Sequence, residues 1–211
     1  MKRLSQKDRL HQCDRPIIAI TGGIGSGKTS FCSILRSFGL EIIDADALIK
    51  NIYQSQEIRD WLEVNSPQKV INSDHPINFK LLREIFFSNN FFKNQLEEIL
   101  YSKLPAQFLS KCTMVSQTQK SILYDVPLLY EKKLETSVDL VVVVYCEYEI
   151  QIKRMMQRDH ISRQLAENIL GQQMSLKQKK DLADEVIWNN ESLETLKENV
   201  KLFYLKYKDI L

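Results

Sequence analysis

Four of the chain's six glycines lie within residues 22–27, and Lys28 and Thr29 follow them directly. Residues 22–29 read GGIGSGKT and match the phosphate-binding pattern G-x-x-x-x-G-K-[ST]. Glycines allow the tight backbone turn that points successive N–H groups toward an anion. The lysine then reaches the β- and γ-phosphates, and the threonine hydroxyl can ligate Mg²⁺. The pattern therefore predicts a nucleoside triphosphate site.

The segments on either side of this loop have the patterns of a strand and a helix. Residues 16–21 form an apolar, β-branched run that is typical of a buried strand. Residues 28–38 carry apolar side chains at helical spacing, and Gly39 follows as a stop signal. A glycine turn without a ligand is the alternative. Strand, glycine loop and helix in this order are nevertheless the context that the motif requires.

Composition is that of an ordinary soluble globular protein. The 211 residues are 44% hydrophobic and 27% charged, which suits one domain with an inserted subdomain. A formal net charge of +2 argues against broad nucleic-acid or membrane binding, and no apolar run approaches the length of a membrane span. Residues 1–15 are polar and lack the apolar region of a secretory signal. We expect them to form a frayed N-terminal extension.

The four cysteines are scattered and show no metal-binding spacing. Cys32 falls in the helix predicted after the glycine loop, and Cys146 falls at a predicted strand end. Reduced, mostly packed thiols in a cytoplasmic protein are the favoured interpretation, with disulfides or a metal site as alternatives. His11, His75 and His160 are isolated in polar stretches, so no histidine site is expected.

Strand patterns alternate with helical patterns along the rest of the chain. Further strands are predicted at residues 40–44, 121–125, 138–145 and 184–188, and helices at residues 47–53, 148–158, 163–180 and 193–211. This alternation predicts an α/β fold of the P-loop nucleoside-triphosphate-hydrolase type, with a parallel sheet flanked by helices. Residues 16–211 would form one kinase domain, whose core is 16–52 and 119–211. Ligands of such sheets bind at the carboxyl ends of the strands.

Residues 53–118 have a different sequence pattern, with a turn-rich stretch at 72–76 and strong helical periodicity from 79 to 109. We expect a mostly helical insertion on the core. Its paired aromatic residues are Phe86, Phe87, Phe91 and Phe92. Core packing is the favoured interpretation of these rings, and an apolar cleft for a long acceptor is the alternative.

The phosphate loop alone does not identify the reaction. The N-K-x-D and D-x-x-G motifs of GTPases do not occur in the sequence, and the chain is short for a motor ATPase, so a small-molecule kinase is favoured. Such a kinase needs a carboxylate that takes the proton of the acceptor hydroxyl. Asp44 and Asp46 follow the second strand, and an extended chain end would point both side chains the same way. Asp46 is the favoured base and Asp44 is the second candidate; capping of the next helix is the alternative.

Further charged residues follow the later strands and helices. Asp125 ends the strand predicted at 121–125, a position from which an acid can hold Mg²⁺ through water. Arg154 and Arg158 lie four residues apart on one helical face, and a break in the helix precedes Arg163. An arginine-bearing segment can close over a triphosphate and neutralise charge on the transferred group. A solvated basic face is the alternative.

Taken together, these segments resemble the bacterial dephospho-CoA kinases. The similarity begins with IIAITGGIGSGKT at residues 17–29 and continues through IDAD at 43–46 and DVPLLYE at 125–131. It resumes with RMMQRD at 154–159 and ADEVI at 183–187. Many families share the phosphate loop, whereas the IDAD and D-x-P-L-L strings at these positions are specific.

The resemblance implies transfer of the γ-phosphate of ATP to the ribose 3′-hydroxyl of dephospho-CoA, which gives CoA and ADP in the last step of coenzyme A biosynthesis. The implied catalytic residues are Asp46, Lys28 and Arg158. Acceptor binding would involve Thr21, Asp46 and Asp125. The implied ATP-binding residues are Gly23, Ile24, Gly25, Ser26, Gly27, Lys28, Thr29, Ser30 and Arg158.

The resemblance also implies Mg²⁺ as a cofactor, held by Thr29 directly and by Asp125 through water. Arg154, Arg158 and Arg163 would belong to a lid at about residues 154–175, and the helical insertion would bind the acceptor. ATP and dephospho-CoA are the expected partners of a cytoplasmic protein, for which a monomer is favoured.

The chain departs from the family pattern within the insertion. Tyr101 and Ser102 stand where the family commonly has His-Pro, Phe79 stands where it commonly has an arginine, and the usual Phe-Gly ahead of that region is missing. A related kinase acting on a nucleoside monophosphate or another small hydroxyl acceptor is therefore the alternative. A non-catalytic nucleotide switch is a further alternative, against which Asp46 argues because a switch needs no acceptor-side base.

Overall fold

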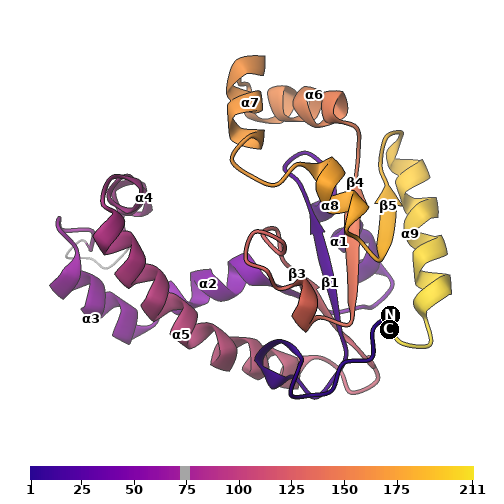
Figure 1. Ribbon diagram of the computed structural model, residues 1–211, viewed down its shortest axis with the longest axis horizontal. Helices are drawn as coiled ribbons and strands as arrows, with labels where there is room; N and C mark the ends of the chain where they lie inside the picture. The colour runs from indigo at the N-terminus through magenta and orange to yellow at the C-terminus, as the bar shows by residue number, and fades with distance from the viewer. Residues whose placement is uncertain (72–76) are drawn as a thin grey trace. The chain divides into compact units, whose positions relative to one another are not determined.

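The computed structural model describes residues 1–71 and 77–211, so the turn-rich stretch predicted at 72–76 lies outside the described residues. The chain forms two compact units (Figure 1). The first comprises Met1–Ala45 and Cys112–Leu211, and the second comprises Asp46–Lys111. The insertion predicted at about 53–118 has different bounds from the second unit, which begins and ends earlier.

The first unit is built on a parallel sheet, in which the described residues form five strands in the order β2-β3-β1-β4-β5. The strands are β1 (Ile17–Gly22), β2 (Ile42–Asp44), β3 (Ile122–Asp125), β4 (Leu140–Tyr145) and β5 (Glu185–Trp188). Every residue of β1, β3 and β4 is buried, as expected for central strands that are covered on both faces. The predicted parallel sheet flanked by helices is confirmed.

Helices pack on this sheet through apolar side chains that alternate along the strands. The helices of this unit are α1 (Lys28–Ser37), α6 (Tyr148–Asp159), α7 (Arg163–Leu170), α8 (Leu176–Asp181) and α9 (Leu193–Tyr207), with short 3-10 helices η1 (Leu10–Gln12) and η2 (Glu135–Ser137). Ile18 and Ile20 of β1 share a buried cluster with Phe31 of α1 and Phe203 of α9. The two rings meet edge to face with centroids 5.6 Å apart. This cluster holds α1, and hence the phosphate loop before it, firmly on the sheet.

The helix predicted at residues 163–180 is wrong, because α7 ends at Leu170 and α8 begins only at Leu176. Ser175 caps α8: its hydroxyl accepts a hydrogen bond from the Gln178 backbone amide, and the Gln178 side-chain oxygen accepts one from the Ser175 backbone amide. This reciprocal cap starts a new helix, which the apolar periodicity alone does not reveal.

The second unit is helical. It contains most of α2 (Ala45–Tyr53), then α3 (Gln56–Asn65), α4 (Phe79–Ser88) and most of α5 (Asn90–Met114). The helical periodicity predicted at residues 79–109 is confirmed and is divided between two helices, because Asn89 has extended backbone and separates α4 from α5. Asn89 instead accepts a hydrogen bond from the Phe92 amide at 3.0 Å, which starts α5.

The aromatic residues of this unit divide between its core and its surface. Phe92 is buried and stacks on Trp61 with ring centroids 5.8 Å apart, and Phe86 packs against the same cluster. Phe87 and Phe91 are 71% and 73% exposed, so the predicted core packing is wrong for these two rings. Among the described residues, no helix is both long and apolar enough to cross a membrane.

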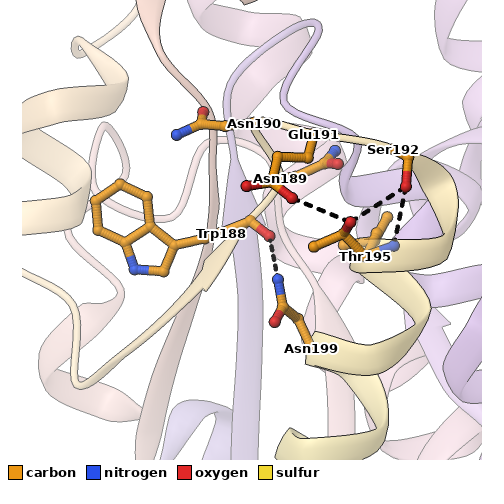
Figure 2. A pocket seen from close by; sticks show the side chains of 8 residues that line it. Trp188, Asn189, Asn190, Glu191, Ser192, Thr195 and Asn199 are labelled. Atoms are coloured by element: carbon orange, nitrogen blue, oxygen red, sulfur yellow. Dashed lines mark hydrogen bonds between the residues drawn. The ribbon is translucent and has the colours of Figure 1, made fainter.

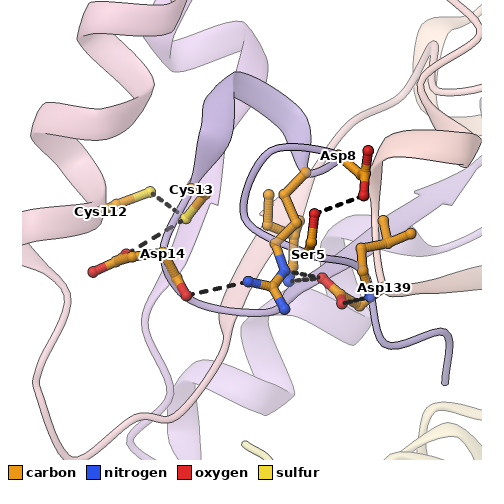
Figure 3. Close-up of polar contacts among 9 residues, drawn as sticks. Ser5, Asp8, Cys13, Asp14, Cys112 and Asp139 are labelled. Carbon is orange, nitrogen blue, oxygen red and sulfur yellow. Dashed lines mark hydrogen bonds and ion pairs between the residues drawn. The ribbon is translucent and has the colours of Figure 1, made fainter.

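The predicted fraying of residues 1–15 is wrong, because this segment is tied to the buried carboxylate of Asp139 (Figure 3). Asp139 Oδ2 accepts hydrogen bonds from the Ile17 amide at 2.9 Å and from Arg9 Nε at 2.8 Å. Asp139 Oδ1 accepts one from the Leu4 amide at 3.1 Å. A buried carboxylate needs such donors, and the N-terminal segment supplies them.

The four cysteines are free and buried. Cys13 and Cys112 lie together, with their sulfur atoms 3.9 Å apart (Figure 3). The hydrogen bond between Cys13 and Cys112 lowers the pKa of the Cys13 thiol, although burial acts in the opposite direction.

Candidate active site

The phosphate loop connects β1 to α1 and has the backbone shape that its glycines allow. Gly25 and Gly27 have φ angles of 77° and 91°, in the left-handed region that other residues rarely adopt. Gly27 is the residue before α1, which begins at Lys28. The first amides of α1 therefore open onto the end of the loop, and such a helix N-terminus favours an anion.

Neighbouring side chains hold this loop from outside. Asn189, which follows β5, donates a hydrogen bond from Nδ2 to the Ser26 carbonyl at 2.8 Å. A methyl group at Gly27 would lie 2.0 Å from the same Nδ2 atom, so a larger residue does not fit there. Gln151 of α6 is buried and donates to the Ile24 carbonyl at 2.8 Å.

Arg154 completes this support. Its guanidinium donates to the Asn189 carbonyl at 3.0 Å and to the Gly25 carbonyl at 3.3 Å. The lid residue predicted at this position thus holds the carbonyl side of the loop. Sequence reasoning missed Asn189 and Gln151 because amide side chains carry no motif, although Asn189 lies two residues after the family-like ADEVI segment at 183–187.

Lys28 and Asp125 form an ion pair at the carboxyl ends of the strands. The side chain of Asp125 is 8% exposed and that of Lys28 is 17% exposed. Cys32 of α1 donates to Asp125 Oδ2 at 3.6 Å, and burial, with the Asp125 charge adding to it, raises the pKa of the Cys32 thiol to about 12. The thiol therefore stays protonated, and Asp125 is held between two donors.

The remaining predicted residues occupy different kinds of position in the chain. Asp44 is the last residue of β2 and pairs in register with Asp125 of β3. Asp46 lies in the first turn of α2 and is the first residue of the second unit. The extended chain end predicted for both acids is wrong, since α2 begins at Ala45. Thr21 is buried, and its hydroxyl donates to the Pro127 carbonyl at 3.1 Å.

Arg158 and Arg163 flank the turn between α6 and α7, where His160 has a left-handed φ of 53°. Arg158 pairs with Asp159, its Nε lying 2.8 Å from Oδ1, and this lowers the pKa of the Asp159 carboxyl. Arg163 pairs with Glu149 at 2.7 Å and lowers the pKa of that carboxyl in the same way. The structure thus places both exposed arginines in ion pairs with nearby acids.

A polar cavity of about 240 Å³ lies where β5 passes into α9 (Figure 2). Its lining includes Trp188, Asn189 and Thr195, and the Trp188 carbonyl accepts a hydrogen bond from Asn199 Nδ2 at 2.9 Å. The cavity adjoins the phosphate loop, because Asn189 lines the cavity and also donates a hydrogen bond to Ser26 of the loop. Its amides and hydroxyls can donate and accept hydrogen bonds to a polar ligand.

Oxygen ligands suited to Mg²⁺ are present at the phosphate loop. Thr29 lies exposed in the first turn of α1, and Asp125 offers a carboxylate. Within residues 1–71 and 77–211, no cluster of three or more histidine, cysteine or carboxylate side chains could hold a metal by itself. This donor set fits Mg²⁺, which commonly binds through one or two protein oxygens together with substrate phosphates.

Comparison with known proteins gives one consistent family. The sequence model of the family "Dephospho-CoA kinase" matches residues 16–195. A dephospho-CoA kinase of Fusobacterium nucleatum is 35% identical over 187 residues, which are 89% of this chain and 96% of that protein. A dephospho-CoA kinase of Vibrio cholerae is 33% identical and covers 90% of this chain and 95% of its own length.

Solved structures agree with this family. The dephospho-CoA kinase of Campylobacter jejuni has a TM-score of 0.70 at 27% identity, covering 92% of this chain and 98% of that one. A Thermus thermophilus protein reaches 0.78 at 26% identity, covering 91% and 97%. With the phosphate loop and the parallel sheet in place, these similarities show that the chain belongs to the dephospho-CoA kinase family.

Proposed function

We propose that the protein transfers the γ-phosphate of ATP to the ribose 3′-hydroxyl of dephospho-CoA, producing CoA and ADP. The observation that carries this proposal is the phosphate loop with its Lys28–Asp125 ion pair, in a chain of this family. A kinase needs a cation for the phosphates and a carboxylate near them, and this pair supplies both.

In the proposed reaction, Lys28 leaves Asp125 and binds the β- and γ-phosphates, while loop amides and the N-terminus of α1 hold the phosphate oxygens. Asp46 takes the proton of the 3′-hydroxyl as its oxygen attacks the γ-phosphorus. The bond from that phosphorus to the β–γ bridging oxygen breaks, and the electron pair leaves with ADP. Arg158 stabilises the charge on the transferred group.

Thr29 and Asp125 would hold Mg²⁺, and the ion, when bound, would neutralise charge on the nucleotide phosphates. Once Lys28 has moved to the phosphates, Asp125 is free to take this role. Thr21 is proposed to contribute to acceptor binding, and its bond to Pro127 fixes its hydroxyl beside the loop that follows Asp125.

The test is ADP formation from ATP and Mg²⁺ with dephospho-CoA, beside adenosine, AMP, CMP, shikimate and gluconate. ADP should form with dephospho-CoA, together with CoA. Asp46→Asn should lower kcat by about 10²–10⁴-fold, the usual contribution of a general base, and leave ATP binding nearly unchanged. Asp44→Asn tests the second candidate base in the same assay, and near-normal turnover in the Asp46 variant would refute the role assigned to Asp46.

A kinase for another small hydroxyl acceptor is the second candidate. It is favoured by the family departures Phe79 and Tyr101, which are 49% and 41% exposed and so can change what the helical unit binds. Turnover of another acceptor without any response to dephospho-CoA would establish this reading. ATP binding without transfer to any acceptor would favour a nucleotide switch.

The proposal also includes a cytoplasmic location and a monomeric state. Four buried free thiols support a reducing compartment. Light scattering of the purified protein measures the oligomeric state, and a mass of twice the chain's 24.7 kDa would show a dimer instead.

A further inference from the structure

Lys179 of α8 is a lysine whose side chain is completely buried. Its ammonium lies 2.9 Å from Glu131 Oε1 and donates hydrogen bonds to the carbonyls of Pro127 at 3.0 Å and Gly22 at 3.3 Å. A lysine ammonium has three N–H groups, so these three acceptors use all of them. No motif in the sequence singled this residue out.

The two carbonyls belong to segments that frame the proposed reaction. Gly22 is the last residue of β1 and the first of the phosphate loop. Pro127 follows Asp125 by two residues, and its carbonyl also accepts the Thr21 hydroxyl. The Lys179 ammonium therefore links the first residue of the phosphate loop to the segment that follows Asp125.

Glu131 anchors the other side of the ammonium. Its Oε1 atom also accepts a hydrogen bond from the Met174 amide at 3.1 Å, in the segment that leads into α8. Its Oε2 atom is buried and has no hydrogen-bond partner in the part of the chain that the structure describes. The pair is thus largely removed from water, and each charge depends on the other.

Stability alone is a weak reason for such a pair. Replacing a buried ion pair by apolar residues is often neutral or stabilising, whereas removing one partner leaves an uncompensated charge. Lys28 provides the contrast: it is partly exposed, has one carboxylate partner and can move to a nucleotide. Lys179 is enclosed and bonded to main-chain oxygens, an arrangement that fixes backbone positions.

We propose that Lys179 is a positioning residue for phosphoryl transfer, which holds the Gly22 and Pro127 carbonyls and thereby aligns the phosphate loop with Asp125. This inference rests on the proposed function for its kinetic consequence. It concerns geometry rather than contact with the substrate, and misplacement of reacting groups by small distances lowers rate strongly.

The experiment compares Lys179→Met, Lys179→Arg and the double variant Lys179→Met/Glu131→Gln with Lys177→Met, an exposed lysine of the same helix as control. The single Met variant can fail to fold because Glu131 loses its partner. The double variant removes both charges, so it is the variant that decides the question.

In the folded double variant, kcat for ADP formation with dephospho-CoA should fall at least about tenfold, while KM for dephospho-CoA changes less than about threefold. Amide hydrogen exchange at residues 22–28 and 126–128 should become faster, and Lys179→Arg should retain more kcat than Lys179→Met. Wild-type kcat or wild-type exchange in the folded double variant would overturn the proposal.

The two hypotheses fail in different ways. If the unmodified protein does not phosphorylate dephospho-CoA, the proposed function is refuted, and hydrogen exchange still tests the positioning role. If the unmodified protein is active and the double variant exchanges and turns over normally, only the role of Lys179 is refuted.

Discussion

Arg154 and Arg158 lie four residues apart on α6, yet their partners are of opposite kinds. Arg154 donates to main-chain carbonyls of the phosphate loop and of Asn189. Arg158 pairs with the exposed carboxylate of Asp159, next to it in the chain. Such surface ion pairs contribute little stability and are easily exchanged for another anion. The loop region is thus built before substrate binds, whereas the α6–α7 turn holds its arginines in replaceable contacts.

This difference suggests a division of work in catalysis. A fixed phosphate loop needs no rearrangement when charge develops, which is the advantage of preorganised donors. An arginine that must reach the transferred group after the substrates have entered benefits from weak contacts in the free protein. The following predictions test whether the two regions differ in this way.

Among the variants of the phosphate loop and of α6, the largest effect is expected from Lys28→Ala. Loss of the cation that binds the β- and γ-phosphates should lower kcat/KM by about 10²–10³-fold and weaken ATP binding as well. Steady-state ADP formation and ATP titration measure the two effects, with Lys177→Met as control. Unchanged kinetics would refute the assignment of the phosphate loop.

Gly27→Ala should disrupt the loop region next most strongly. An added methyl group would clash with Asn189 Nδ2, and the φ of 91° strains any residue other than glycine. Gly39→Ala is a matched control, since Gly39 has a φ of 84° and no atom within 4 Å of an added methyl group. The control should lose about 1–2 kcal/mol of unfolding free energy from backbone strain alone. Denaturant unfolding should show a larger loss of unfolding free energy for Gly27→Ala than for Gly39→Ala. Equal losses would mean that the Asn189 side chain moves away from the added methyl group at no cost.

Replacing Arg158 should affect mainly catalysis, whereas replacing Arg154 should affect mainly stability and ATP binding. Arg158→Ala should lower kcat by about tenfold or more and leave the Tm unchanged, because it removes an exposed group that acts on the transferred phosphate. Arg154→Ala should lower the Tm and weaken ATP binding, because the Gly25 and Asn189 carbonyls lose the guanidinium donor that holds the loop in place. Kinetics and thermal unfolding of both variants decide this, and identical profiles would contradict the proposed division of work.

The smallest effect concerns pH. Arg163 lowers the pKa of Glu149 in the folded protein, so the pair contributes stability above the ordinary glutamate pKa and loses it as the pH falls through the lowered value. Arg163→Ala should return the Glu149 pKa to its ordinary range in an NMR titration. The Tm difference between the variant and the unmodified protein should be small at neutral pH and vanish in acid. Arg163 also pairs with Glu167 at 2.8 Å, and protonation of that carboxylate removes this contribution in acid as well. A difference that grows in acid would refute the stabilising role assigned to these pairs.

Local patterns were sufficient where neighbouring residues decide the outcome. The phosphate loop, the strand before it and the helix after it follow from glycine freedom and apolar periodicity within residues 16–39. The valine-rich run of β4 likewise reads as a buried central strand. Helix breaks were less predictable: the starts of α5 and α8 depend on single polar caps, Asn89 and Ser175, inside long apolar patterns.

By itself, the sequence determined that this chain carries a phosphate loop on a parallel sheet, and it pointed to Lys28, Asp46 and Asp125 as the residues of the reaction. Only the tertiary structure decided what holds that loop. Asn189 bonds to Ser26 across 163 residues of sequence, and Lys179 bonds to Gly22 across 157. Such partners leave no local pattern, because the strand order and helix packing, rather than the neighbouring residues, bring their polar atoms within hydrogen-bond distance.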